Sequence, residues 1–485
     1  MSGGAKQFRL VDVILSVICV VFVAEAIAPA AAIGNSQFFW WVFLIIAFLL
    51  PYGLVVSELG TTYSDDEGGL YDWVRRAFGD TWAARVAWYY WINFPLWMAS
   101  LAVLFPSTVN AMTGRSLGTV PSLVISLVFI WAVVFLSFSR ASDSIWIMNL
   151  AAVLKVGIAV VVGGLGIYYA LSHGFASDMS PSTFLPSFDT GALTYLSIIL
   201  FNFMGFEVVA TYASDMKDPK TQIPKAIIWG GLAIAIIYMV SSFGMGVAIP
   251  SSELSLDSGV MDAVGIMAGA GSILLVLVGI VFLVTLVGNM VSWAFGVNFV
   301  VVCAAQDGNL PRPLASVTRS SRMPKGASIA NGVIASILVA FLPVANALGI
   351  SDLFWMLFSV NVVFILLSYI PIFPAFLKLR RVDAEARRVF RVPGAGILLR
   401  VIVWLPVILV VLAVLATIVP LSGSADEMTK LPGLVAVVVF LVLGEAVRII
   451  SGRRSASIYR GMETDGDPMP RAELVATDGE GDSTL

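Results

Sequence analysis

Three ionisable side chains of this chain lie deep inside apolar stretches. Glu25 and Glu207 each lie about 15 residues into such a stretch, which is roughly 22 Å along a helix, and Lys155 lies about ten residues into another. An ionisable group at the centre of a membrane costs about 2.5 to 3.5 kcal/mol, so each of the three calls for a functional role. A buried glutamate can exchange a proton or bind an amine, and a buried lysine supplies a fixed positive charge.

The sequence around both glutamates is poorly suited to an uninterrupted helix. The segment AEAIAPA at 24–30 places Pro29 in the middle of its stretch, where it removes a backbone hydrogen bond. The segment FNFMGFE at 201–207 combines an asparagine, a glycine and Glu207. Non-helical backbone at this depth is tolerated where it lines a cavity, and paired interruptions of this kind are typical of transporter binding sites. The substrate-contacting residues predicted from these segments are Glu25, Ala26, Ile27, Ala28, Asn202 and Gly205.

The composition explains which solvent surrounds these segments. Of 485 residues, 59% are hydrophobic and 12% are charged, and the mean hydropathy is +0.94. Soluble domains carry about 25% charged residues, so a soluble enzyme is excluded and a membrane protein is expected. One histidine and two cysteines are too few for a histidine and cysteine metal cluster, a haem-binding bundle or a disulfide framework. No cofactor is therefore expected.

A membrane-spanning helix needs about 20 mostly apolar residues, and twelve such stretches are predicted. The first has no cleavage pattern close behind it and is interpreted as a retained helix, not a signal peptide. The predicted spans are 10–33, 39–60, 83–112, 120–138, 145–171, 192–213, 225–249, 271–302, 328–348, 352–377, 398–420 and 431–450.

The placement of Lys and Arg predicts the orientation. With the N-terminus in the cytoplasm, these residues fall on the cytoplasmic side or at its rim, apart from Arg115, Lys430 and the buried Lys155. The chain is therefore expected in the cytoplasmic membrane, with both termini in the cytoplasm. The predicted parts are a cytoplasmic N-terminus (1–9), a ten-helix core (10–377) of two inverted repeats at about 10–171 and 192–377, two further helices (398–450) and a disordered cytoplasmic tail (452–485).

The order of short motifs resembles the amino acid-polyamine-organocation superfamily, and within it most closely the glutamate/GABA antiporter family. The resemblance covers nearly the whole membrane domain. The motifs are PYG at 51–53, EL at 58–59, EGGLYDWV at 67–74, FG at 78–79, FMGFE at 203–207, DMKDP at 215–219, IP at 223–224, ELSL at 253–256, GVM at 259–261, DGNLP at 307–311 and FRVPG at 390–394.

This resemblance implies a leucine-transporter-type fold with alternating access and a substrate site between spans 1, 3, 6, 8 and 10. It implies that Glu207 couples protonation to the gate and that Phe201 is an aromatic gate. Trp293 matches a tryptophan that stacks on the substrate, and Tyr90 and Asn361 fall near positions that line the site.

Two further consequences concern charge. Lys155 resembles a lysine of some relatives, whose ammonium occupies the volume that a sodium ion fills in the sodium-coupled members. Sodium-independent transport is therefore expected.

Many relatives have a Gly-x-Gly turn in span 1 that binds the substrate carboxylate, whereas this chain has Glu25 among alanines. An anionic side chain there attracts an amine, so the expected activity is transport, by exchange, of an amino acid or its decarboxylated amine. The alternative is a proton-coupled symporter of the same substrates.

Other interpretations are open at this stage. Pro29 and Gly205 are also compatible with simple kinks, Lys155 with a lysine that reaches the interface, and Tyr90 with an interfacial aromatic belt. A sensor, a channel or a membrane enzyme would need features that the sequence does not show, such as a ring-forming selectivity motif or a nucleophile beside a base. The expected partners are a small amino acid or amine and the lipid bilayer, with no nucleic acid, in a monomer or homodimer.

Overall fold

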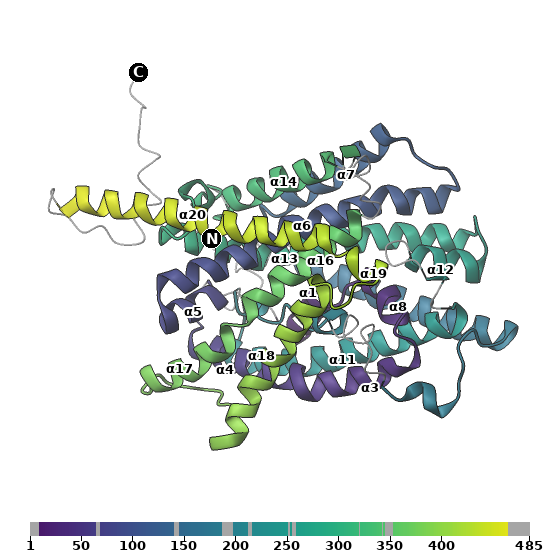
Figure 1. Ribbon diagram of the computed structural model, residues 1–485, viewed down its shortest axis with the longest axis horizontal. Coiled ribbons are helices and arrows are strands. Elements are labelled where there is room, and N and C mark those ends of the chain that lie inside the picture. The colour runs from purple at the N-terminus through teal and green to yellow at the C-terminus, as the bar shows by residue number, and fades with distance from the viewer. Residues whose placement is uncertain are drawn as a thin grey trace, which may run out of the picture.

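The computed structural model describes residues 9–64, 68–139, 145–186, 197–211, 216–250, 253–254, 259–319, 321–341, 343–344 and 353–463. The named elements of these residues are helical, and an isolated β-bridge joins Val317 to Pro324. Figure 1 shows the long helices side by side in a bundle.

The first half of the chain contains α1 (Leu10–Val21), η1 (Ala24–Ala26), α2 (Ile27–Ala31), η2 (Gly34–Ser36), α3 (Gln37–Leu44), η3 (Ile45–Leu49), α4 (Leu50–Thr62), α5 (Leu70–Phe78), α6 (Asp80–Thr113), α7 (Thr119–Leu136), α8 (Ile145–His173) and η4 (Pro181–Phe184). The second half contains α10 (Val208–Thr211), α11 (Pro219–Ala248), α12 (Gly259–Ala268), α13 (Ile273–Gln306), η7 (Arg312–Ala315), α14 (Lys325–Ala340), α16 (Leu353–Tyr369), α17 (Ile372–Val382), α18 (Gly396–Ile418), α19 (Ala425–Met428) and α20 (Leu431–Glu463).

The long apolar helices confirm a multi-pass membrane protein. Nine helices of the described chain are long and apolar enough to cross a bilayer, and a bent pair of shorter helices brings the number to ten. The predicted span at 192–213 is described only from residue 197 to 211, and the one at 328–348 is represented by α14, which has 16 residues. The total of twelve spans therefore stays a prediction.

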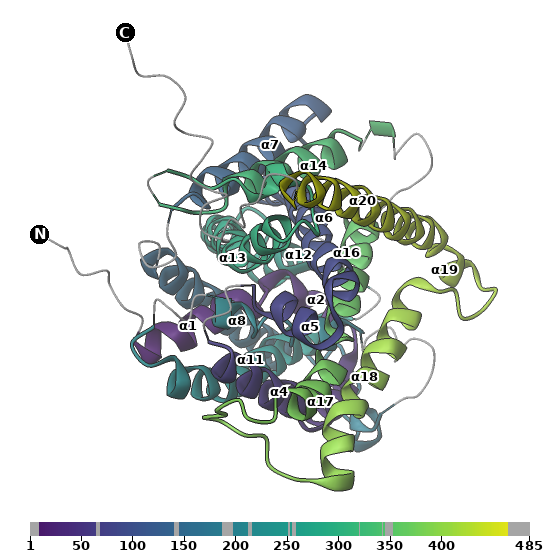
Figure 2. The ribbon, with the colours of Figure 1, turned by 90° about the vertical axis from the view of Figure 1, so that its left-hand side faces the viewer.

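The surface of the outer helices fits a lipid environment. Large apolar side chains point outward along α7, α18 and α20, where a water-facing helix would carry charges. Figure 2 shows α18 and α20 at the edge of the bundle. Examples of these exposed residues are Val120, Val124, Val128, Val401, Ile408, Val435 and Val442. The helix α20 continues past Gly452, where the sequence predicts that a disordered tail begins, and residues 464–485 lie outside the described residues.

The first span is interrupted, but earlier than the sequence suggests. The two helices Leu10–Val21 and Ala24–Ala31 meet at an angle of 53°. The residues between them, Phe22 and Val23, have extended backbone. Pro29 does not cause the break. It lies in the first turn of α2, where a backbone N–H has no partner within the helix, so its missing N–H costs nothing.

The sixth span is interrupted where the sequence predicts. Its first helical part ends at Phe201, residues 202–207 form turns and irregular backbone, and α10 (Val208–Thr211) follows. Gly205 has φ +109°, a conformation that side-chain-bearing residues rarely adopt. The two interruptions lie in the interior of the bundle, because α1 packs against α8, α11 and α13, and α10 packs against α13. Figure 2 shows α2 in the centre of the bundle in end-on view.

Candidate functional site

Lys155 binds the backbone at the end of α1. Its Nζ atom lies 2.5 Å from the carbonyl oxygens of both Cys19 and Phe22, and 2.7 Å from Oδ1 of Asn289 on α13. The last carbonyl groups of a helix have no partner within the helix, and in lipid water does not supply one. The lysine ammonium supplies the missing donors at the break. Because the side chain is only 1% exposed, it does not reach the interface, and that interpretation of Lys155 is excluded.

Glu207 lies at the centre of a group of tyrosine hydroxyls. Tyr90 on α6 donates a hydrogen bond to Oε1 of Glu207 at 2.6 Å, and Tyr52 on α4 donates one to Oε2. A third hydroxyl, that of Tyr369 on α16, accepts a hydrogen bond at 2.9 Å from the backbone N–H of Gly205. The carboxylate therefore joins the interrupted sixth span to α4 and α6. Tyr90 is fully buried, so it is not part of an interfacial belt.

Trp293 on α13 connects the two interruptions. Its indole N–H donates a hydrogen bond at 2.7 Å to the carbonyl oxygen of Val20, beside the break in the first span. Its ring covers Gly205 so closely that a Cβ atom there would lie 2.7 Å from the Cζ2 atom of Trp293. The indole of Trp97 meets the Trp293 ring edge-on, with ring centroids 5.4 Å apart. The tryptophan is thus held by hydrogen bonding and packing against both interrupted spans.

Phe201, the predicted gate, belongs to the same aromatic cluster. Its ring centroid lies 5.6 Å from that of Trp97 and 5.2 Å from that of Phe358 on α16. Asn361, which follows Phe358 by about one helical turn, lies on the same side of α16. The contact between Phe201 and Phe358 therefore joins the sixth span to the side of α16 that carries Asn361.

Several buried polar atoms around these aromatic rings have no hydrogen-bond partner among the residues described. Unpaired polar groups in a membrane interior are costly, so these atoms are available to bind a polar ligand. None of the described histidine, cysteine, aspartate and glutamate side chains are grouped so that three could hold a metal ion. Among the unpaired atoms of the described chain are Glu25 Oε1, Asn93 Oδ1, Trp97 Nε1, Asn289 Nδ2 and both side-chain polar atoms of Asn202 and of Asn361.

The predicted site residues differ in how the structure places them. Ala26 ends a short 3-10 turn, and Ile27 and Ala28 begin α2, so their backbone is helical. The expectation of an unwound segment at these three residues was therefore wrong, because the extended backbone lies at Phe22 and Val23. Of the other predicted residues, Phe201, Asn202, Gly205 and Glu207 lie in or next to the break of the sixth span, and Glu25 follows the break of the first. Tyr90 binds Glu207, Lys155 binds Phe22 and Trp293 binds Val20, whereas Asn361 is placed only on α16.

Four residues near the breaks were not predicted as site residues. They are Tyr52, Trp97, Asn289 and Tyr369. A sequence signal existed for Tyr52, because it carries a polar hydroxyl between a proline and a glycine within an apolar span. For Asn289 the signal was a side-chain amide in the middle of a long apolar helix. Trp97 and Tyr369 are not distinguished from the many other aromatic residues until the packing is known.

One end of the bundle, which the charge distribution predicts to be cytoplasmic, is closed by ion pairs. Glu58 on α4 binds Arg380 on α17 through two hydrogen bonds of 2.8 and 2.5 Å. The same carboxylate lies 3.3 Å from the guanidinium of Arg388 and accepts a 2.6 Å hydrogen bond from the backbone N–H of Val392. We refer to Glu58, Arg380, Arg388 and Val392 as the Glu58 latch. It ties the loop between α17 and α18 to α4.

Two further contacts support this end. Arg75 on α5 pairs with Asp307, at the end of α13, at 2.6 Å. Tyr63 donates a hydrogen bond at 2.9 Å to Asp383 in the loop after α17. Partial burial, and to a lesser extent the bond to Asp383, raise the pKa of Tyr63 to about 12, so its hydroxyl keeps its proton at physiological pH. These contacts and the Glu58 latch join three different loops at one end of the bundle.

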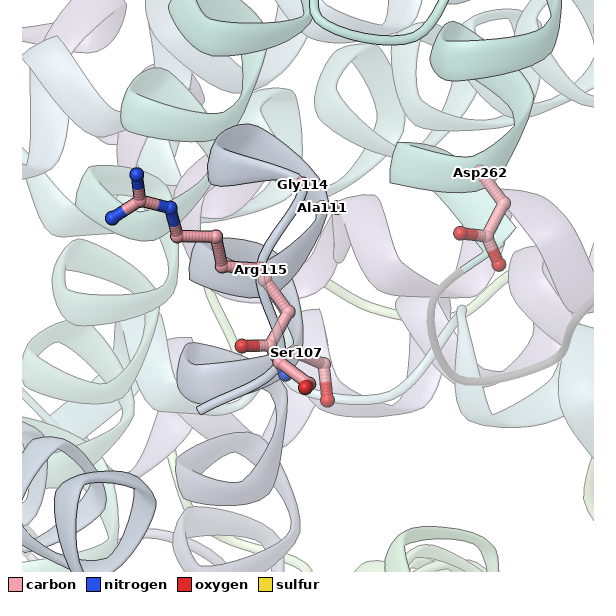
Figure 3. A pocket seen from close by; sticks show the side chains of 7 residues that line it. Ser107, Ala111, Gly114, Arg115 and Asp262 are labelled. Carbon is pink, nitrogen blue, oxygen red and sulfur yellow. The ribbon is translucent and has the colours of Figure 1, made fainter. Parts of the chain in front are cut away.

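The opposite end contains an open pocket. It has a volume of about 410 Å³ and lies between the end of α6 and α12. Figure 3 shows Arg115 and Asp262 on opposite sides of this pocket, with the guanidinium of Arg115 pointing away from Asp262. The other residues that line it are Ser107, Asn110, Ala111, Gly114 and Ser116.

Comparison with known proteins agrees with this architecture. The amino acid permease family matches residues 8–443. The chain is 50% identical over 449 residues to a probable agmatine/putrescine antiporter of Lactococcus lactis, which covers 92% of this chain and 96% of that protein. It is 21% identical over 409 residues to a glutamate/gamma-aminobutyrate antiporter of the same species, covering 82% of this chain and 80% of that protein. The fold is similar to that of a manganese transporter of Eremococcus coleocola, with a TM-score of 0.56 at 13% identity over 91% of this chain and 94% of that chain. The interrupted helices, the apolar exterior and these matches show that the chain belongs to the amino acid permease family of membrane transporters.

Proposed function

We propose that the protein exchanges a cationic amine, or the amino acid from which it derives, across the cytoplasmic membrane without sodium. The pair most strongly favoured is external agmatine against internal putrescine. The relative with 50% identity over nearly the full length of both chains is described as a probable agmatine/putrescine antiporter. Both molecules carry positive charge at each end and no carboxylate, which matches the charge of the site described above.

The observation that carries this proposal is that Glu25 is buried and that one of its carboxylate oxygens lacks a hydrogen-bond partner. Its side chain is 4% exposed, and its Oε1 atom has no hydrogen-bond partner among the described residues. Lys155, the nearest fixed cation, uses its ammonium group on two carbonyl oxygens and an amide oxygen. A buried carboxylate oxygen without a partner is unfavourable, and the ammonium group of a substrate would relieve that cost.

Aromatic rings supply the second element of cation recognition. Trp97, Trp293 and Phe201 surround the level at which both spans are interrupted. A cation over an aromatic face gains up to about 2 kcal/mol when water is excluded. The unpaired amide groups of Asn202 and Asn361 offer oxygen acceptors for a second charged end of the substrate. An extended dication can therefore use a carboxylate, aromatic faces and amide oxygens together.

Alternating access would proceed around the two interruptions. We propose twelve spans, with the first ten arranged as two inverted repeats and both termini in the cytoplasm. The Glu58 latch and the pair of Arg75 with Asp307 would seal the cytoplasmic end in this state. Glu207 would couple to the movement, because its carboxylate contacts two helices at once and its affinity for a proton changes when those contacts are lost.

Reconstitution into liposomes tests the exchange. Vesicles preloaded with putrescine should take up labelled agmatine much faster than empty vesicles, and replacing sodium by choline on both sides should leave the rate unchanged. A strict requirement for sodium would contradict the part assigned to Lys155. Failure of every amine and amino acid tested to accelerate uptake from the opposite side would contradict the exchange itself.

The same vesicles distinguish exchange from proton-coupled symport. An exchanger requires a substrate on each side, whereas a symporter fills empty vesicles when a proton gradient is imposed. Net uptake into empty vesicles, driven by an inward proton gradient and abolished by a protonophore, would favour symport. We expect uptake to depend on the internal substrate instead.

A further inference from the structure

We propose that Glu25 selects the decarboxylated amine against its parent amino acid, by placing a fixed negative charge where the carboxylate of the amino acid would lie. This inference rests on the proposed function, because it assigns the substrate class of the same site. Agmatine and arginine share their guanidinium and amino groups and differ only in the α-carboxylate. The same difference separates putrescine from ornithine.

The charge balance of the membrane interior supports this selection. Lys155 is the only lysine or arginine that is buried within the described part of the chain. The buried acids are Glu25 and Glu207, next to the two breaks, and Glu58 and Asp72, at the end of the bundle that carries the Glu58 latch. The hydrogen bonds of Lys155 to Cys19, Phe22 and Asn289 use all three of the N–H donors that an ammonium group has. Of the two acids next to the breaks, Glu207 accepts hydrogen bonds from Tyr52 and Tyr90, whereas Glu25 has an unpaired oxygen, so the proposal assigns the unbalanced negative charge to Glu25.

The surroundings of Glu25 give its charge a specific position. The residue belongs to the 3-10 turn that follows the extended residues of the first span, and it lies beside the indole of Trp97. Trp97 in turn contacts Trp293 and Phe201, so the carboxylate lies at one edge of the aromatic cluster. An amine that binds over these rings brings its ammonium group to Glu25. The carboxylate of an amino acid, attached one carbon from that ammonium group, would be brought to the same place.

Specificity against an unwanted ligand is commonly obtained by an unpaired or repelling charge. A second carboxylate in this region of low dielectric would face Glu25 with no free cation between them. The repulsion acts only on the amino acid, whereas the attraction acts on the ammonium group of both ligands. The selection therefore depends on the charge of the α-substituent and not on its size.

A ligand series on the wild-type protein tests this point without any mutation. Purified protein in detergent is titrated with agmatine, arginine and argininamide in mildly acidic buffer, and binding is measured by calorimetry. Argininamide has a substituent of nearly the same size as the carboxylate but without its charge. We expect agmatine to bind at least about tenfold more tightly than arginine, with argininamide closer to agmatine. Argininamide binding as weakly as arginine would show that size decides, and the inference would be wrong.

Substitution of Glu25 provides the second test. In Glu25→Gln, the ratio of agmatine affinity to arginine affinity should fall by about tenfold or more, because attraction to the amine weakens and repulsion of the carboxylate disappears. Glu25→Asp keeps the charge and should keep the preference. The matched control is Asp262→Asn, which removes the same charge from the outer pocket near α12 and should leave the ratio unchanged.

The outcomes separate this inference from the proposed function. If the wild type exchanges amines but Glu25→Gln shows the same ratio as the wild type, the selectivity role is refuted and the exchange function stands. If Asp262→Asn changes the ratio as strongly as Glu25→Gln, the overall charge of the protein decides and not the charge at Glu25, which also refutes the inference. If the wild type binds neither amines nor amino acids, the proposed function itself fails. Should Glu25→Gln not fold, the ligand series on the wild type still decides.

Discussion

The ammonium nitrogen of Lys155 lies 2.5 Å from the carbonyl oxygen of Phe22, the residue at which the first span stops being helical. The interrupted backbone thus has a protein cation bound to it. A helix that ends inside a membrane leaves carbonyl oxygens that only another donor can satisfy. Here the donor is the ammonium group of Lys155 on α8. The interrupted backbone therefore needs the lysine as a donor, and the buried lysine needs the carbonyl oxygens as acceptors.

Removing this cation should destabilise the protein. In Lys155→Met, the carbonyl oxygens of Cys19 and Phe22 and the Asn289 amide oxygen lose their donor, at a cost of about 3 kcal/mol or more. The measurement is the apparent unfolding temperature of purified protein in detergent. The matched control is Lys220→Met, which changes an exposed lysine on α11 and should leave that temperature nearly unchanged. Equal stability of the two variants would mean that Lys155 does not hold the break.

Neutralising Glu207 should alter the pH dependence of exchange. The carboxylate of Glu207 accepts hydrogen bonds from Tyr52 and Tyr90, and Glu207→Gln removes the titrating group while it keeps the size of the side chain. We expect the rate profile of exchange against pH to flatten. Tyr52→Phe removes one donor to the ionised carboxylate, so it should displace the profile toward higher pH without flattening it. A profile of Glu207→Gln that matches the wild type would contradict the coupling role.

Replacing Trp293 separates aromatic stacking from its backbone hydrogen bond. Trp293→Leu loses both the ring and the bond to Val20, and should weaken substrate binding by about 2 kcal/mol through the lost cation-π contact, with a further loss from the unpaired carbonyl. Trp293→Phe keeps an aromatic face and should bind more tightly than Trp293→Leu. Equilibrium binding of labelled agmatine gives both values. Wild-type affinity in Trp293→Leu would remove the residue from the site.

A methyl group at Gly205 should not be tolerated. Gly205 has φ +109°, and a Cβ atom there would lie 2.7 Å from Trp293 and 3.0 Å from Val20. Gly205→Ala should therefore destabilise the protein by about 1 to 3 kcal/mol and strongly reduce exchange. Gly164→Ala in α8 is the control, because no atom lies within 4 Å of the added methyl group. Its stability should equal or slightly exceed that of the wild type, as measured by thermal unfolding.

The sequence predicts much of the fold because lipid imposes simple requirements. Length and hydropathy locate the spans, and a polar side chain at mid-depth marks each position that needs an internal partner. The interruption after Phe201 was predicted from an asparagine, a glycine and Glu207 in one short segment. The roles of Lys155 and Trp293 as centrally placed residues were predicted from the family resemblance, and the structure places both beside the interruptions.

The remaining features depend on contacts that a single chain does not reveal. Pro29 was interpreted as the cause of the first break, yet the same residue is equally suited to the first turn of a helix, and only the packing distinguishes the two. The hydroxyls of Tyr52 and Tyr369 come from helices far apart in the sequence, so their meeting near Glu207 has no local signal. The sequence shows which helices are long enough to cross the membrane, but not which of their residues face one another.

The attachment of Glu58 has a consequence for how the protein opens. One carboxylate holds two guanidinium groups and a backbone amide that all belong to the segment from Arg380 to Val392. Both guanidinium groups also bind backbone carbonyl oxygens of this part of the chain, Arg380 that of Val392 and Arg388 those of Leu379 and Asp383, among others. The segment therefore keeps internal bonds of its own when the carboxylate withdraws. We therefore expect this end of the bundle to open by movement of one preformed segment away from α4, with its contacts to Glu58 lost together.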